Sequence, residues 1–141
     1  MRSSTCKRLN FDLRSTRDSV NRVAAMLSCF FDKQKLPDEV TFDIKLATQE
    51  AVVNAAEHGN KYDHSKNVHI SCETTDRAVT VTVCDEGLGF DPCCVLDPTL
   101  PENILRENGR GVFLMRNLCD EVRFNDKGNK VTIVKHIPNS Q

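Results

Sequence analysis

Hydrophobic residues recur at helical spacing in two stretches near the start of the chain. In the first stretch they stand three or four positions apart, which predicts a helix with one buried stripe. The stripe consists of Val20, Val23, Leu27, Phe30 and Phe31. Ser15 and Asp18 stand ahead of it in a capping arrangement, and Leu36-Pro37 ends the helix.

The second helix is predicted over 38–58, and its last part is apolar nearly all round. This pattern is typical of a buried helix. Glu50 and Asn54 nevertheless lie in that part, four residues apart and therefore on one face, and His58 continues the stripe. A buried carboxylate beside a buried amide is unfavourable by several kcal/mol unless a partner satisfies both groups. This helix face therefore predicts a ligand.

Alternating hydrophobic and polar positions predict β-strands in other parts of the chain. Two antiparallel strands are expected around 68–72 and 79–83. A hairpin is expected over 122–133, about a turn at 126–129. The signal for a short strand at 6–10 is weaker. The chain shows no internal repeat and no low-complexity tail.

Residues 90–108 have no clear periodicity and contain three of the five prolines. A loop of this length inside a compact domain is usually functional or disordered. Gly87 and Gly89 precede it at a strand end, and Gly109 and Gly111 follow it and open another apolar helix. Glycine lets the backbone approach a ligand closely, and a helix N-terminus attracts anions such as phosphates. Tight turns explain most such pairs singly, but both pairs together with the polar helix face favour a ligand site.

The composition is that of an ordinary globular protein. The chain has 141 residues, of which 39% are hydrophobic and 28% charged, and its formal net charge is -1. We expect one domain spanning 1–141. The near-neutral charge argues against a general nucleic-acid binder. The sequence has neither an apolar run of about 18 residues that would span a membrane nor the apolar stretch of a secretory signal, which predicts a cytoplasmic protein.

Seven cysteines occur without any CxxC pair, a pattern that fits neither a disulfide framework nor a zinc ribbon. Cys72 and Cys84 fall inside apolar alternations, where a thiol acts as a small hydrophobic group. Reduced thiols are therefore favoured over a redox or metal role. The adjacent Cys93-Cys94 is the one pair that stands apart.

Several polar residues are candidates for chemistry. Glu50 is a general base, the partner of a basic residue, or an exposed side chain of a misassigned helix. Asn54 offers an oxygen to Mg²⁺, which needs few protein ligands when phosphates supply the rest. Asp85, at a strand end, either accepts hydrogen bonds from an amino group or belongs to a turn. His58, followed by Gly59, fits the C-terminal end of a helix.

Three segments resemble the motifs of one superfamily. Residues 50–60, EAVVNAAEHGN, resemble the N-box of the GHKL ATP-binding superfamily of gyrases, histidine kinases and their relatives. Residues 85–89, DEGLG, resemble its first glycine box, and 109–112, GRGV, its second. The form of the N-box, the short chain and the ending 118–122, LCDEV, are similar to the anti-sigma factor serine kinases of bacterial partner-switching systems. The resemblance covers essentially 7–137.

The resemblance implies a fold and a role for each matched residue. The fold is α/β, a two-layer α/β sandwich (the Bergerat ATP-binding fold) with helices on one face of a mixed, mostly antiparallel sheet. Glu50 matches the general base, Asn54 the Mg²⁺ ligand, and Asp85 the acceptor of the adenine amino group. The loop at 90–108 matches the ATP lid. The other residues implied to contact the nucleotide are His58, Gly59, Gly87, Gly89, Arg106, Gly109, Arg110, Gly111, Val112 and Asn129.

Two positions depart from the superfamily pattern. Gly128 is followed by Asn129, where a threonine often helps to hold the adenine; an amide also forms hydrogen bonds. Glu107 stands two residues before the second glycine box, where some of these kinases carry an arginine. The candidates for positive charge on the phosphates are Arg106, Arg110 and Lys61.

The resemblance implies an ATP- and Mg²⁺-dependent serine/threonine protein kinase that acts as an anti-sigma factor. An anti-sigma factor antagonist would be its substrate and a sigma factor a second partner, and such proteins are often homodimers. No direct contact with nucleic acid or membrane is expected. An ATP-binding switch without phosphoryl transfer is the alternative, against which Glu50 argues because binding alone needs no base. A histidine-kinase fragment is disfavoured, since the residues before Pro37 contain no histidine.

Overall fold

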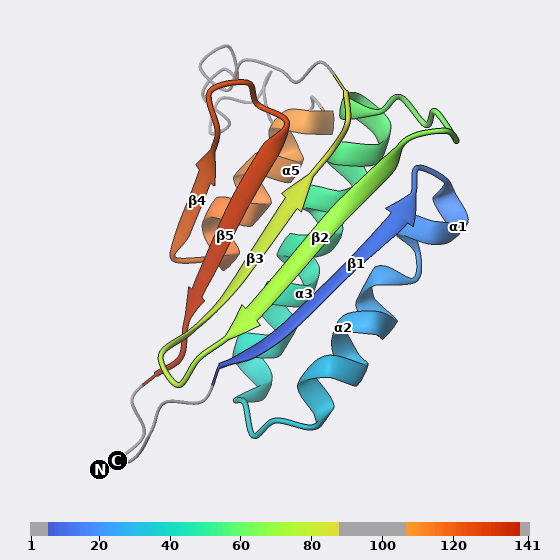
Figure 1. The fold of residues 1–141 in the computed structure, drawn as a ribbon. Helices are drawn as coiled ribbons and strands as arrows, with labels where there is room; N and C mark the ends of the chain where they lie inside the picture. The colour runs from blue at the N-terminus through green and yellow to red at the C-terminus, as the bar shows by residue number, and fades with distance from the viewer. Residues whose placement is uncertain (1–5, 88–106, 139–141) are drawn as a thin grey trace.

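The computed structural model describes residues 6–87 and 107–138, and of 107–110 only the backbone. The labels used below are those of Figure 1. The strands are β1 (Lys7–Arg14), β2 (Asn67–Thr74), β3 (Ala78–Cys84), β4 (Glu121–Phe124) and β5 (Lys130–His136). The helices are α1 (Arg17–Val20), α2 (Val23–Asp32), α3 (Asp38–Val53), η1 (Asn54–Gly59) and α5 (Glu107–Leu118).

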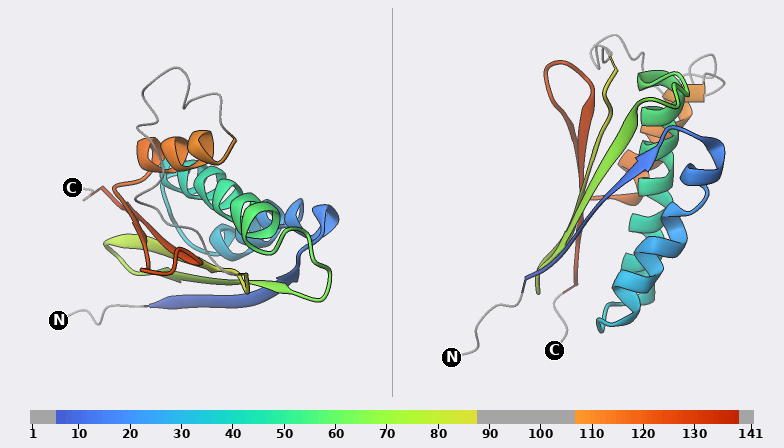
Figure 2. Two further views of the ribbon diagram at one scale, coloured as in Figure 1. Left: turned by 90° about the horizontal axis from the view of Figure 1, so that it is seen from above. Right: turned by 45° about the vertical axis from the view of Figure 1, so that its right-hand side comes forward.

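The five strands form one sheet in the order β1-β2-β3-β5-β4, and every neighbouring pair is antiparallel. The parallel pairing that a mixed sheet would contain is absent from the described strands. Helices α2, α3 and α5 lie on one face of the sheet, and no described helix covers the other face (Figures 1 and 2). The two-layer α/β sandwich is therefore confirmed.

The core lies between the two layers. On β2 and β3 every second side chain points at the helices and is buried, as Val68, Ile70 and Val81 show. These residues belong to the same hydrophobic cluster as Ile44 of α3. The strands predicted around 68–72 and 79–83 are confirmed, each one or two residues longer at its ends.

The first predicted helix is interrupted and forms α1 and α2. Its buried stripe is confirmed in Val20, Val23, Leu27 and Phe31. The predicted cap is wrong by one residue, because the Thr16 hydroxyl, not that of Ser15, accepts from the Ser19 N–H (3.1 Å). The Ser15 hydroxyl is buried and donates to the Lys66 carbonyl (3.1 Å). Ser15 does not cap the helix because its hydroxyl forms this tertiary hydrogen bond instead.

The second helix changes type near its end. It is α-helical to Val53 and π-helical over η1, and the Asn60 N–H donates to the Ala55 carbonyl (2.8 Å). A π-helical turn is rare and is often found at functional sites. Because its hydrogen bonds span five residues instead of four, the stripe that was expected to reach His58 reaches Gly59 instead.

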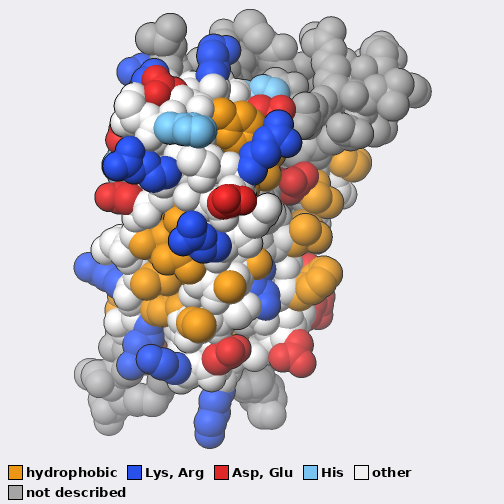
Figure 3. Space-filling view, turned by 90° about the vertical axis from the view of Figure 1, so that its right-hand side faces the viewer, with side chains coloured by type: hydrophobic (Ala, Val, Ile, Leu, Met, Phe, Trp, Pro, Cys, Tyr) orange, Lys and Arg blue, Asp and Glu red, His pale blue; other side chains and the backbone are white. Residues whose placement is uncertain are grey.

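The surface is mixed in character. The side that carries α1 and α2 shows hydrophobic side chains gathered among charged ones (Figure 3). In the first half of the helix predicted over 38–58, Phe42 and Leu46 are 63% and 36% exposed, whereas the expected burial of its last part is seen at Ala47, Ala51, Val52, Ala55 and Ala56. None of the helices in the described ranges has the length and apolar character that crossing a bilayer requires.

The uncovered sheet face carries a bridged histidine. His69 Nδ1 lies 2.7 Å from Asp12 Oδ1, and Nε2 lies 2.6 Å from Glu86 Oε2. Ionised carboxylates only accept hydrogen bonds, so the two contacts together favour the protonated ring, in which both nitrogens donate. The bond to Asp12, followed by the bond to Glu86, raises the pKa of His69.

The two cysteines of the described strands, Cys72 and Cys84, lie on opposite faces of the sheet. Cys72 lies in the core, as expected, and burial raises the pKa of its thiol to about 12. Cys84 pairs with His69 across β2 and β3 and is half-buried on the uncovered face, so its apolar neighbours did not indicate its side. Cys93-Cys94 lies outside the described residues. The described cysteines are all free thiols.

Candidate functional site

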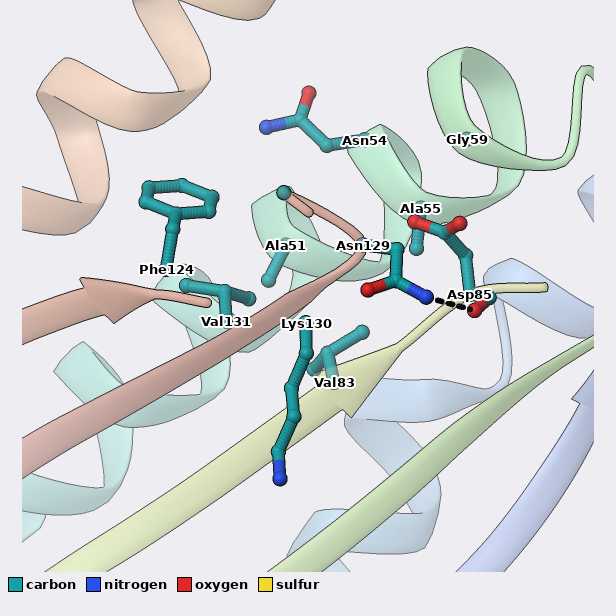
Figure 4. Close-up of a pocket in the computed structure, with 11 residues that line it drawn as sticks. Ala51, Asn54, Ala55, Gly59, Val83, Asp85, Phe124, Asn129, Lys130 and Val131 are labelled. Atoms are coloured by element: carbon teal, nitrogen blue, oxygen red, sulfur yellow. Dashed lines mark hydrogen bonds between the residues drawn. The ribbon is translucent and has the colours of Figure 1, made fainter. Parts of the chain in front are cut away.

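A pocket lies where α3, η1, the end of β3 and the β4–β5 hairpin meet (Figure 4). Its apolar lining consists of Ala51, Ala55, Val83, Phe124 and Val131. Its polar lining includes Asn54, Asp85 and Asn129. Helix and sheet therefore supply apolar walls, while polar groups stand at the two ends.

Asp85 follows β3 and is only 7% exposed. Its Oδ1 accepts from the Gly87 N–H (2.8 Å), and its own backbone N–H donates to the Asn129 carbonyl (2.8 Å). Burial raises the pKa of this carboxyl, and the bond from Gly87 opposes that rise. A carboxylate has about four acceptor positions, so Asp85 retains the capacity to accept a hydrogen bond from a ligand in the pocket.

Two glycines leave the space into which the Asp85 carboxyl fits. A Cβ at Gly59 would collide with that carboxyl, and a Cβ at Gly87 would collide with the Gly59 carbonyl. A larger residue at either position would displace the carboxylate or the backbone that carries it. Through these glycines, η1 lies directly against the loop that follows β3.

Asn129 joins the β4–β5 hairpin to Asp85. Its Nδ2 donates to the Asp85 carbonyl (3.3 Å), and its Oδ1 accepts from Asn125 Nδ2 (2.8 Å). Asn125 Oδ1 accepts from the N–H groups of Gly128 and Lys130 (2.8 and 3.2 Å) and so stabilises the turn. Gly128 has a φ of 79°, which favours glycine there. The asparagine that replaces the superfamily's threonine therefore does contact the strand end.

The other end of the pocket is formed by Asn54 and the start of α5. A Cβ at Gly111 would lie 3.2 Å from Asn54 Nδ2, so this glycine lets α5 approach the asparagine closely. Gly109 and Gly111 both belong to the first turns of α5, where the helix N-terminus attracts anions. An amide oxygen beside such a terminus suits a Mg²⁺ ion that is carried by phosphates.

Glu50 lies one turn before Asn54 on α3 and is half-buried. The helix around it is continuous, so the misassigned-helix alternative is excluded. No ion pair joins Glu50 to a basic side chain within 6–87 or 111–138, so a structural salt bridge has no support there. Glu50 itself does not line the pocket; it precedes by one helical turn Asn54, which does.

Six of the implied residues in the described ranges do not line the pocket: Glu50, His58, Lys61, Gly87, Gly111 and Val112. His58 does not line it, and His58 Nε2 is buried without a hydrogen-bond partner among the described atoms. The Val112 side chain is 1% exposed and belongs to the core. Lys61 follows η1, is exposed and has a positive φ of 53°.

The remaining implied contacts lie wholly or partly outside the described residues. Gly89, Arg106 and positions 90–106 of the expected lid are not described. The last two lid positions, 107–108, already belong to α5. Of Arg110 only the helical backbone is described.

Sequence reasoning missed two asparagines that hold the site together. Asn125 stabilises the hairpin. Asparagine at the first position of a turn, with glycine three residues later, was an available signal. Asn60 is the last residue of the segment that resembles the N-box, and its local sequence indicates no role for it. It is buried and donates to Ser15 Oγ (2.6 Å), a contact far away in sequence that no local pattern indicates.

The sequence model of the Histidine kinase-like ATPase domain family matches residues 13–135. The chain belongs to this family. An anti-sigma F factor of Geobacillus thermodenitrificans is 38% identical over 142 residues, which cover 94% of this chain and 93% of that protein. An anti-sigma F factor of Bacillus subtilis is 32% identical, with the same two coverages, 94% and 93%.

A serine-protein kinase named RsbW, from Staphylococcus epidermidis, is 29% identical over 98% of this chain and 92% of that protein. Among solved structures, a crystal structure of the RsbU and RsbW domains of a Mycobacterium tuberculosis protein has a TM-score of 0.66 at 19% identity. That match covers 96% of this chain and 34% of the longer chain. It shows a shared fold.

Proposed function

We propose that the chain is an ATP-dependent serine/threonine protein kinase that acts as an anti-sigma factor. Membership of an ATPase-domain family supports the use of ATP. Relatives named anti-sigma F factor and serine-protein kinase, matched over nearly their whole length, support the kinase and the partner class. The proposed substrate is an anti-sigma factor antagonist, and a sigma factor is the second proposed partner.

The single observation that supports the nucleotide assignment is the position of the Asp85 carboxyl, which is buried at one end of an apolar pocket. An adenine presents flat apolar faces and an exocyclic amino group that donates hydrogen bonds. A buried carboxylate at one end of an apolar pocket matches both properties. Gly59 and Gly87 leave the room that this carboxylate needs beside η1.

The phosphates are proposed to lie at the Asn54 end. Asn54 would hold Mg²⁺ through its amide oxygen, and the backbone at Gly109 and Gly111 would bind phosphate oxygens. When bound, Mg²⁺ supplies neutralisation of the charge on the transferring phosphoryl group. Side chains proposed to add positive charge are Arg106, Arg110 and Lys61.

Glu50 is proposed as the general base. It takes the proton of the substrate's hydroxyl while that oxygen forms a bond to the γ-phosphorus, and the bond from phosphorus to the departing ADP oxygen breaks. Positioned acid–base groups contribute about 10²–10⁴-fold to a rate. The pure binding switch is not favoured, because it gives no role to a carboxylate next to Asn54.

Two measurements test this proposal. Calorimetric titration of the chain with ATP should show binding that is stronger with Mg²⁺ than without it. Absence of binding at millimolar ATP by a folded sample would overturn the nucleotide assignment. Proteins that the immobilised chain retains should then gain phosphoserine from γ-labelled ATP, as mass spectrometry can show. Binding of ATP without any transfer would favour the switch over the kinase.

A further inference from the structure

Asn60 follows η1 directly and is only 1% exposed. Its Nδ2 donates to Ser15 Oγ (2.6 Å) and to the Asn67 carbonyl (2.9 Å), and its Oδ1 accepts from the Glu86 N–H (2.8 Å). One planar amide thus meets a hydroxyl, a carbonyl and an N–H group. A fully satisfied buried amide of this kind rigidly connects the segments that it bonds.

The bond to Glu86 acts on the peptide group that it shares with Asp85. A peptide group is planar, so holding its two polar ends fixes its orientation. Asn60 holds the N–H end, at Glu86, and Asn129 Nδ2 holds the carbonyl end, at Asp85 (3.3 Å). The orientation of this peptide sets the backbone from which the Asp85 carboxyl projects into the pocket.

We propose that Asn60 is a positioning residue of the adenine site, an inference that rests on the proposed function. It fixes the Asp85–Glu86 peptide and so keeps the Asp85 carboxylate aimed at the amino group of the base. Asn60 itself does not line the pocket. Alanine at this position would leave the Glu86 N–H without its acceptor and one end of the peptide free to rotate.

Inosine triphosphate is the probe that separates positioning from general stability. Inosine carries a carbonyl where adenine carries the amino group, so the group at that position accepts hydrogen bonds and cannot donate to Asp85, while the phosphates are those of ATP. The wild-type chain should bind ATP more tightly than inosine triphosphate by about 5- to 150-fold, the scale of leaving a buried polar group unpaired. Asn60→Ala should bring this ratio to within about threefold of unity and leave the affinity for inosine triphosphate nearly unchanged.

Ser15→Ala is the matched control. It removes the bond at the other end of the same buried amide but leaves the bond to Glu86 in place. It should lower the melting temperature and keep the wild-type ratio when all titrations are run well below every melting transition. An Asn60→Ala chain that keeps the wild-type ratio would overturn the proposal, as would a Ser15→Ala chain that loses it.

Asn60→Asp covers the case in which Asn60→Ala does not melt cooperatively. Aspartate keeps an oxygen for the Glu86 N–H but loses the two bonds that Nδ2 donates. It should therefore melt at a lower temperature than wild type and still keep the wild-type ratio below its own transition, and loss of the ratio in a chain that is folded there would overturn the proposal. A wild-type chain that binds both nucleotides equally would instead refute the role of Asp85. Failure of the proposed function is thereby distinguished from failure of the Asn60 assignment.

Discussion

The two ends of the pocket are constructed differently. At the Asp85 end, the carboxylate and the peptide beside it are held by Gly87, Asn129 and Asn60 through hydrogen bonds of 2.8 to 3.3 Å. At the Asn54 end, Glu50 and Asn54 are half-buried one turn apart, and Gly111 lets α5 approach Asn54 closely. One end is rigid before any ligand arrives, whereas the other presents polar groups to it.

This difference separates recognition from chemistry. A pre-organised acceptor gives affinity and base specificity because little conformational freedom is lost on binding. Groups that act on the phosphates contribute where charge moves during transfer. Variants at the Asp85 end should therefore change nucleotide affinity, and variants at the Asn54 end should change the rate more than the affinity.

The largest expected effect is at Glu50. Glu50→Gln preserves the shape of the side chain and removes the base, so phosphoryl transfer should fall by about 10²–10⁴-fold. ATP affinity and thermal stability should stay close to wild type. The readout is transfer of labelled phosphate to the recovered substrate, alongside calorimetry.

Glu57→Gln is the matched control, since Glu57 is also half-buried and lies about two turns further on, in η1. It should transfer phosphate at nearly the wild-type rate. Equal losses in the two variants would mean that the transfer defect reflects helix damage and not loss of a base.

The next effect is at Asp85. Asp85→Asn replaces part of the acceptor with an amide donor, which should weaken ATP binding by about 1–3 kcal/mol, the scale of an unpaired buried polar group. Transfer at saturating ATP should change much less. Asp126→Asn, in the exposed hairpin turn, serves as control. Unchanged ATP affinity in Asp85→Asn would mean that Asp85 is only a turn residue and does not bind the base.

A smaller effect is expected at Asn129. Asn129→Ala removes one bond to the Asp85 carbonyl, so ATP affinity should weaken by about 0.5–1.5 kcal/mol, the net value of one hydrogen bond. Asn129→Thr supplies a hydroxyl that can form a hydrogen bond in place of the amide, so it should bind ATP better than Asn129→Ala. If the threonine variant binds no better than the alanine variant, the contact contributes through the hairpin backbone alone.

The smallest effect concerns pH and lies on the opposite face of the sheet. The pKa of His69 is raised in the folded state, so its pairing with Asp12 and Glu86 stabilises the fold fully below the unfolded pKa of about 6.5. That contribution is lost as the pH rises through the folded-state pKa. The loss should be small because 42% of the side chain is exposed. Chemical denaturation across this pH range should show a slope in wild type that is reduced in His69→Gln, and equal slopes would contradict the assignment.

The strands, the turn at Gly128 and the helix that opens at the second glycine pair were predictable because their signals are local. Residues spaced by two, or by three and four, mark a strand or a helix wherever the chain then goes. Strand order is a matter of pairing between distant segments, and no local pattern showed that every described pair is antiparallel. The capping error has the same origin, because Ser15 was as good a candidate as Thr16 until its tertiary bond to Lys66 was seen.

The same distinction between local signals and contacts of distant segments applies to the candidate site. Glu50 and Asn54 share a helix face by spacing alone, so their proximity was predictable. The seat of Asp85 between Gly59 and Gly87 depends on η1 reaching the end of β3, and a π-helix has no sequence pattern that distinguishes it from an α-helix. Resemblance to a superfamily supplied the role of Asp85 as the acceptor of the adenine amino group. Only the structure explains why Gly59 and Gly87 are glycines.

The π-helical turn shifts the end of the second helix by one residue relative to a continuous α-helix. In an all-α continuation Gly59 would rotate by about 100° about the helix axis, and His58 would occupy the side that now faces Asp85. A histidine side chain does not fit where even a Cβ would collide with the carboxyl. The placement of Asp85 in the pocket therefore requires the π-helical register. A chain one residue shorter between 55 and 58 would reach the same placement of glycine with ordinary α-helical bonds, so this segment should tolerate a single deletion better than a single insertion.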